Sequence, residues 1–196
     1  AVSLSKQDNI IAVLPLVQGN ARIEAGKKQR RSTVLGVGAA VPEVWKIKVA
    51  SGRFLPKDKQ TNPRAFAVLG HKLAVELFSG SNPLGQRIRI GSDRFRVLGV
   101  MEKKGQMLGF DMDDTVYIPT AKALELFDRQ GVMEIDMLYK INTSVKTIES
   151  TIKRLLISRH GREDFTLITQ DKMLKSMDSI LSILTLSVAA LGGISL

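Results

Sequence analysis

The sequence contains no cysteine, which excludes disulfide bonds, thiolate zinc sites and a cysteine nucleophile. Aromatic residues are also scarce, at 5% of the 196 residues, so a hydrophobic core must be built mainly from aliphatic side chains. Because 44% of the positions are hydrophobic, the chain is apolar and long enough for one large domain or two small ones. The composition therefore excludes a disulfide-stabilised scaffold and a globally disordered chain.

The motifs that enzymes and nucleotide-binding proteins need are missing as well. The only two histidines, His71 and His160, are far apart in the sequence, and no nucleophile elbow is present. There is no phosphate-binding GxxxxGK[ST] loop. Gly36-Val37-Gly38 begins like a dinucleotide-binding fingerprint, but Val41 stands where the third glycine belongs. We therefore expect a protein that is not an enzyme and that binds no cofactor or metal.

A cluster of acidic residues, Asp111, Asp113 and Asp114, is compatible with two kinds of structure. Three carboxylates in one loop are able to bind a cation, but the glycine and the distal glutamate of an EF-hand loop are absent. The alternative is a solvated loop whose carboxylates cap backbone N–H groups. The missing EF-hand residues favour this second interpretation.

Basic residues outnumber acidic residues by 29 to 19, which gives a formal net charge of +10 and suggests an anionic partner. The densest basic cluster, Lys27, Lys28, Arg30 and Arg31, follows Gly26. Such a short run beside a glycine is typical of a solvated hairpin tip, and a phosphate- or lipid-binding patch is the alternative. A basic nucleic-acid-binding domain is the alternative function, although the scarcity of aromatic residues for base stacking speaks against it.

The C-terminal segment differs from the rest of the chain, because residues 179–196 carry no formal charge. A helix that spans a membrane needs about 20 predominantly apolar residues. An amphipathic surface helix would show charges at every turn, and this segment shows none. We therefore expect residues 179–196 to form the start of a transmembrane helix.

Local patterns predict strands and helices in alternation, with hairpins among them. The clearest hairpin covers residues 86–100, where two alternating segments flank a Gly-Ser-Asp turn. Further strands are expected near residues 16–25, 33–37, 65–70, 115–118, 134–141 and 164–168. Helices are expected at residues 5–13, 71–78, 121–127 and 144–160, and from Gln170 onward. This arrangement indicates an α+β fold with mixed sheets.

The order of several short motifs resembles the extracytoplasmic domain of ABC-transporter permeases of the MacB and FtsX-like type. The motifs are Gly52-Arg53-Phe54, Val68-Leu69-Gly70, Leu77-Phe78, Pro83-Leu84-Gly85-Gln86, residues 95–100, residues 113–119 and residues 160–165. The resemblance covers roughly residues 30–196, and residues 160–165 point toward the MacB-like branch.

The resemblance implies a two-lobed α+β domain. An α/β lobe formed by both chain ends, residues 1–46 and 121–178, would carry an inserted α+β lobe at residues 47–120, followed by the start of a transmembrane helix at 179–196. Such a domain lies on the periplasmic side of the bacterial inner membrane, between two membrane helices. It couples cytoplasmic ATP hydrolysis to extracytoplasmic work, such as export. The implied partners are a second permease copy, an ABC ATP-binding domain or subunit, the membrane and a periplasmic adaptor protein.

Two segments are candidates for function. The loop of residues 105–110 contains three apolar side chains between glycines, and we expect Met107, Leu108 and Phe110 to contact a partner. The alternative is that these side chains pack onto the domain's own core. The second segment links the domain to the expected membrane helix, and its candidate coupling residues are Asp171, Leu174, Asp178, Leu181 and Leu184.

Overall fold

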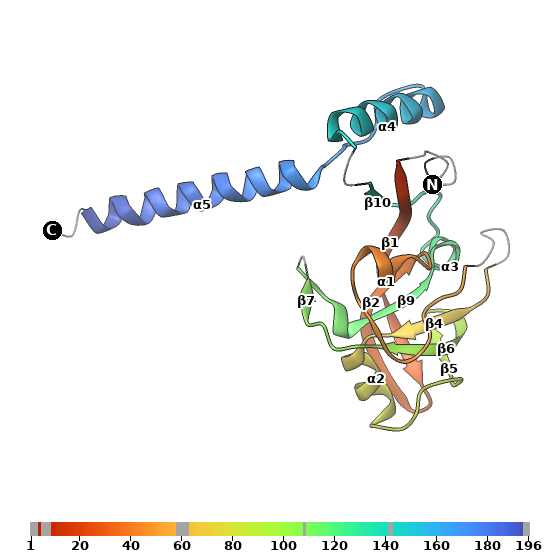
Figure 1. Cartoon of the computed structure of the whole chain (residues 1–196). Helices are drawn as coiled ribbons and strands as arrows, with labels where there is room; N and C mark the ends of the chain where they lie inside the picture. The colour runs from red at the N-terminus through yellow and green to blue at the C-terminus, as the bar shows by residue number, and fades with distance from the viewer. Residues whose placement is uncertain (1–3, 5–8, 58–62, 108, 141–142, 194–196) are drawn as a thin grey trace. The chain divides into compact units, whose positions relative to one another are not determined.

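The computed structural model describes residues 4, 9–57, 63–107, 109–140 and 143–193 (Figure 1). The chain divides into two compact units, residues 1–140 and residues 141–196. The first unit is built around a mixed sheet, and the second contains two helices. The expected α+β class with mixed strand directions is confirmed.

The first strand, β1 (Ile10–Ala25), runs for 16 residues and pairs with different strands along its length. Its beginning pairs antiparallel with β10 (Glu134–Tyr139), and from Val17 onward it pairs antiparallel with β2 (Lys28–Val37). The predicted helix at residues 5–13 is therefore wrong for residues 10–13, while residues 5–8 lie outside the described residues. The β-branched residues of this segment favour a strand once a partner is available, and β10 comes from a distant part of the chain.

Five further strands complete the sheet. They are β3 (Val49–Gly52), β4 (Phe66–Leu69), β5 (Arg87–Ile90), β6 (Asp93–Met101) and β9 (Thr115–Pro119). The order is β10-β1-β2-β9-β4-β6-β3, and β5 joins β6 back to β1. Strands β2 and β9, like β4 and β6, are parallel, whereas the other pairs are antiparallel. Because the ring β1-β2-β9-β4-β6-β5 is closed, β10 and β3 are the edge strands of this sheet among the described residues.

Three helices accompany the sheet: α1 (Val41–Val44), α2 (His71–Phe78) and α3 (Thr120–Leu126). Thr120 is the first residue of α3, and its hydroxyl donates a hydrogen bond to the carbonyl of Pro15. The buried side chains form two clusters, and most of them are aliphatic, as the composition predicts. Both clusters contain residues from 1–46 and from 47–120, and the division into two lobes stays a prediction.

The second unit consists of α4 (Val145–His160) and α5 (Gln170–Gly193). Gly161 ends α4 in the left-handed conformation with φ +74°, directly after the range expected for this helix. The strand predicted at residues 164–168 is absent from the described structure, because this segment pairs with no other strand. The helix expected from Gln170 onward is confirmed as far as Gly193. Among the described residues, no helix combines the length and apolar character needed to cross a membrane.

Gly36 allows α3 to approach β2 closely, which gives a test of the packing. A Cβ atom at Gly36 would lie only 2.1 Å from the Cβ atom of Ala123. We expect Gly36→Ala to lower the free energy of unfolding by about 1–3 kcal/mol, because overpacking forces the helix away. Chemical denaturation followed by the fluorescence of Trp45, the only tryptophan, measures the change. Gly131→Ala is the matched control, since its Cβ would meet nothing within 4 Å; equal losses would contradict the prediction.

Candidate interaction and coupling sites

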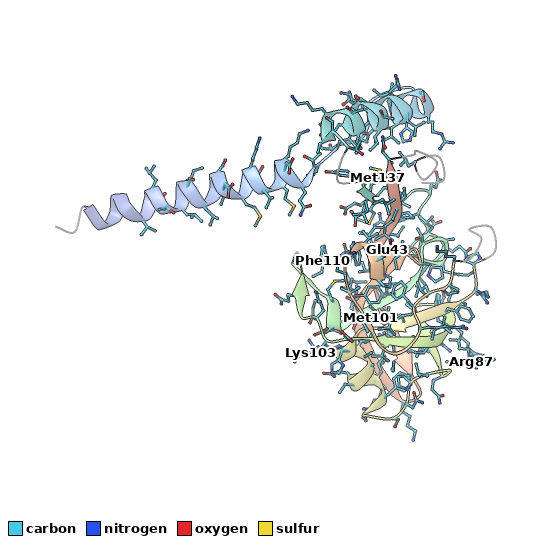
Figure 2. All side chains as sticks on the ribbon, viewed as in Figure 1. Glu43, Arg87, Met101, Lys103, Phe110 and Met137 are labelled. Carbon is cyan, nitrogen blue, oxygen red and sulfur yellow. The ribbon has the colours of Figure 1, made fainter. Side chains whose placement is uncertain are left out.

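A small hairpin formed by β7 (Gln106–Met107) and β8 (Phe110–Asp111) contains the loop that the sequence marked for partner contact. Phe110 has 42% of its surface exposed, and Figure 2 shows it on the hairpin at one side of the first unit. This exposure agrees with a contact role for Phe110 and not with packing on the domain's own core. Leu108 lies outside the described residues, and Met107 is placed only as a residue of β7. Partner contact by the three residues stays a prediction.

The base of this hairpin is held by two aspartate carboxylates that accept backbone hydrogen bonds. Asp113 is buried and accepts the N–H groups of Lys104 and Gly105 at 2.7 and 3.0 Å. Asp111 accepts the N–H groups of Asp113 and Asp114 at 3.1 and 3.2 Å, at the start of the 3₁₀ turn η1 (Met112–Asp114). The carboxylates thus cap backbone groups. Within the described residues, no cluster of three or more histidine or acidic side chains is arranged to hold a metal ion.

Asp114 is the centre of an ion-pair network that joins β2, α2 and η1. Arg30 donates two hydrogen bonds to its carboxylate, at 2.9 and 2.5 Å, and the Ser32 hydroxyl donates a third at 2.8 Å. Lys72 on α2 lies 3.2 Å from the Asp111 carboxylate and 3.6 Å from that of Asp114. The hydrogen bond from Arg30, followed by that from Ser32, lowers the pKa of the Asp114 carboxyl, although burial opposes this effect.

The network changes the interpretation of the basic cluster near Gly26. Lys27 lies at the turn, as a solvated hairpin tip requires, but Arg30 is half-buried and belongs to β2. Sequence reasoning missed the role of Arg30. The available signal was its alternation with Ser32 and Val34, which places the three side chains on the same face of β2.

The coupling candidates all lie on α5, and their side chains are exposed. Leu174, Leu181 and Leu184 have between 53% and 60% of their surface exposed. Asp171 and Asp178 are exposed as well. Lys172 lies beside these residues and donates a hydrogen bond of 2.6 Å to Glu149, which ties the start of α5 to α4. The coupling role of the five residues stays a prediction.

The segment between α4 and α5 is fastened to α4 by two further contacts. The Nδ1 atom of His160 lies 2.8 Å from the carboxylate of Asp164, and Lys153 lies 2.7 Å from Glu163. The hydrogen bond to His160 lowers the pKa of the Asp164 carboxyl. His160 therefore has a structural contact at the end of α4.

Removing the Asp114 charge tests the network. We expect Asp114→Asn to lower the free energy of unfolding by about 1–3 kcal/mol at neutral pH, because hydrogen bonds between charged groups contribute about that much. The folded pKa is lowered, so this stabilisation is fully present above the ordinary value of 3.8 and is lost as the pH falls through the folded value.

Urea denaturation at a series of pH values measures the effect of Asp114→Asn. The difference in the free energy of unfolding between the unmodified protein and Asp114→Asn should narrow below about pH 4, because Asp114 then becomes protonated. Asp128→Asn is the matched control, because Asp128 is exposed and asparagine tolerates its left-handed backbone (φ 48°). A difference in the free energy of unfolding that stays constant across the pH range would contradict the stabilising role of the Asp114 charge.

Comparison with known proteins places this architecture in a family. The family model of the MacB-like periplasmic core domain matches residues 1–155. The macrolide export ATP-binding/permease protein MacB of Marinobacter nauticus is 26% identical over 99% of this chain. The pyoverdine export ATP-binding/permease protein PvdT of Pseudomonas entomophila is 28% identical over 99% of this chain. The chain spans only 30% of the length of each relative.

Two solved structures share the fold. The periplasmic region of MacB from Actinobacillus actinomycetemcomitans superposes with a TM-score of 0.78 at 24% identity, covering 91% of this chain and 80% of that one. The extracellular domain of the transporter YknZ from Gram-positive bacteria gives a TM-score of 0.68 at 20% identity, covering 83% of both chains. The chain belongs to the family of MacB-like periplasmic core domains.

Proposed function

We propose that this chain is the non-catalytic periplasmic domain of an ABC exporter permease in the inner membrane, and that it transmits movement of the membrane helices to extracytoplasmic partners. The observation that carries this proposal is the pairing of β1 with β10. The N–H group of Lys140 donates a 3.0 Å hydrogen bond to the carbonyl of Asn9, and Ile10 lies opposite Tyr139. The chain therefore enters and leaves the first unit at adjacent points, as an insertion between two membrane helices requires.

The link toward the second of these helices would be α5. Its apolar side chains from Ile180 to Val188 are exposed, so they are available to lipid or to other helices of the permease. In this proposal residues 179–196 begin a membrane helix, and Asp171, Leu174, Asp178, Leu181 and Leu184 transmit its movement. In this proposal the domain has two lobes that would move together. One lobe comprises residues 1–46 and 121–178, and the other comprises residues 47–120.

The partners in this proposal follow from the family. A second permease copy would form the dimer in the membrane, and an ABC ATP-binding domain or subunit would supply the energy. A periplasmic adaptor protein would receive the movement. The curated relatives are named for macrolide and pyoverdine export, so the full permease would act in export. The β7–β8 hairpin supports partner contact, since its base is held by Asp113 while Phe110 is exposed.

Uncoupling the link between α4 and α5 tests the proposed transmission. We expect a Gly-Ser-Gly-Ser insertion after Thr166 in the full permease to leave ATP hydrolysis intact and to abolish the ATP-dependent movement of the domain. A spin label at Ser92→Cys in both copies reports this movement by pulsed EPR, because these 196 residues contain no other thiol; any cysteine elsewhere in the permease is first replaced by serine. The same insertion between Gly80 and Ser81, in an exposed turn, is the control. An undiminished change in label distance after the Thr166 insertion would refute the proposal.

The hairpin provides a second test. We expect replacement of Met107, Leu108 and Phe110 by serine to weaken binding of the adaptor or of the second copy by about tenfold or more, because buried apolar anchors dominate contact energies. The melting temperature should stay unchanged, since Phe110 is exposed. Serine at Val75, an exposed apolar residue on α2, is the control. Unchanged binding by the triple variant would remove the hairpin from the interface.

A further inference from the structure

Four neighbouring strands of the ring carry a group of arginine side chains that point away from the core. In the order β2, β1, β5 and β6, each strand pairs with the next. The side chains that alternate with the arginines, such as Ile23, Ile88 and Phe95, are buried. The arginines themselves are exposed, and Figure 2 shows Arg87 at the outer edge of the first unit. This arginine face consists of Arg22, Arg31, Arg87, Arg89, Arg94 and Arg96.

The strand register places like charges directly opposite one another. Arg87 lies opposite Arg96, Arg89 opposite Arg94, and Arg22 opposite Arg31. Like charges in such positions destabilise a sheet. A local arrangement that opposes folding is expected where a function requires it.

The acidic residues of the described chain do little to compensate this charge. Glu24 lies opposite Arg89, and the two side chains form an ion pair of 3.9 Å. Within the described ranges, this is the only ion pair of the arginine face. An open hollow lies at the same place, lined by Glu24, Gly26, Arg87, Ile88, Arg89 and Arg94. The guanidinium groups of this face are therefore available to an anionic ligand.

We propose that the arginine face binds an extended acidic segment of a partner protein. Each planar guanidinium group is able to donate two parallel hydrogen bonds to a carboxylate. Arg87 and Arg89, like Arg94 and Arg96, are two residues apart on a strand, which spaces them by about 6.6–6.8 Å. An extended polypeptide with acidic residues at alternate positions repeats its carboxylates at the same spacing. The two patterns are complementary in charge and in period.

A lipid surface and a nucleic acid fit this face less well. This argument rests on the proposed function, in which the end of the unit at Asn9 and Lys140 faces the membrane. Arg22 lies about 40 Å further along β1. The Debye length at physiological salt is about 8 Å, so lipid charges are screened at that distance. Binding of single-stranded nucleic acid relies on exposed aromatic side chains for base stacking, and the only aromatic residue on the four strands, Phe95, is buried.

Binding of a synthetic peptide of alternating glutamate and threonine to the 196-residue chain tests the proposal. We expect joint replacement of Arg87, Arg89, Arg94 and Arg96 by glutamine to weaken binding by at least about tenfold, because the paired guanidinium groups are lost. The melting temperature should stay the same or rise, since repulsion between opposite arginines is removed. The control variant carries glutamine at Lys46, Lys48, Lys103 and Lys104. It loses the same amount of positive charge outside the arginine face, and its affinity for the peptide should stay within about twofold of the unmodified chain.

Every other outcome overturns the proposal. These outcomes are no binding of the peptide, an equal loss in both variants, and tighter binding of phosphatidylglycerol vesicles or single-stranded DNA than of the peptide. A fall in melting temperature in the arginine variant would assign the residues a structural role. The peptide assay needs no membrane, ATP or second subunit, so its failure is distinguishable from failure of the transmission experiment.

Discussion

Backbone pairing along β1 connects the parts of the first unit, because this one strand contacts β10, β2 and β5 in turn. Its beginning joins the points where the chain enters and leaves the unit. Its end closes the ring through β5 and carries part of the arginine face. Between its beginning and its end the strand pairs first with β10 and then, from Val17 to Ala25, with β2. In the proposed coupling function, this 16-residue strand would connect the entry point of the chain with the ring.

The acidic residues near the β7–β8 hairpin contribute structure and leave the hairpin tip available for contact. Asp113 and Asp111 satisfy backbone N–H groups, while Asp114 joins β2 to α2 through Arg30 and Lys72. Charged partners at the base restrict the hairpin, and Phe110 remains exposed. A fixed base with an exposed apolar side chain lowers the entropy lost on binding, which suits a contact site.

Arginine residues in the first unit thus have two opposite roles. Arg30 is paired with a carboxylate and stabilises the junction of β2 with η1. The arginines on β5 and β6 face one another and destabilise their own hairpin in the absence of a ligand. The difference lies in their neighbours, because the Asp114 carboxylate lies within hydrogen-bonding distance of Arg30, whereas the Glu24 carboxylate lies 3.9 Å from Arg89. The net charge of +10 combines these roles and does not distinguish between them.

Local patterns determined the parts of this protein whose partners lie nearby in the sequence. The hairpin of β5 and β6, helix α2 and the end of α4 at Gly161 follow from alternation, helical period and a glycine in the left-handed conformation. Tertiary structure decided the strand at residues 10–13, the absence of a strand at 164–168 and the pairing of Arg30 with Asp114. A strand and an ion pair both need a partner, and here each partner comes from a distant part of the chain. The physical reason is that backbone propensity acts locally, whereas strand pairing and charge compensation depend on which segments the fold brings together.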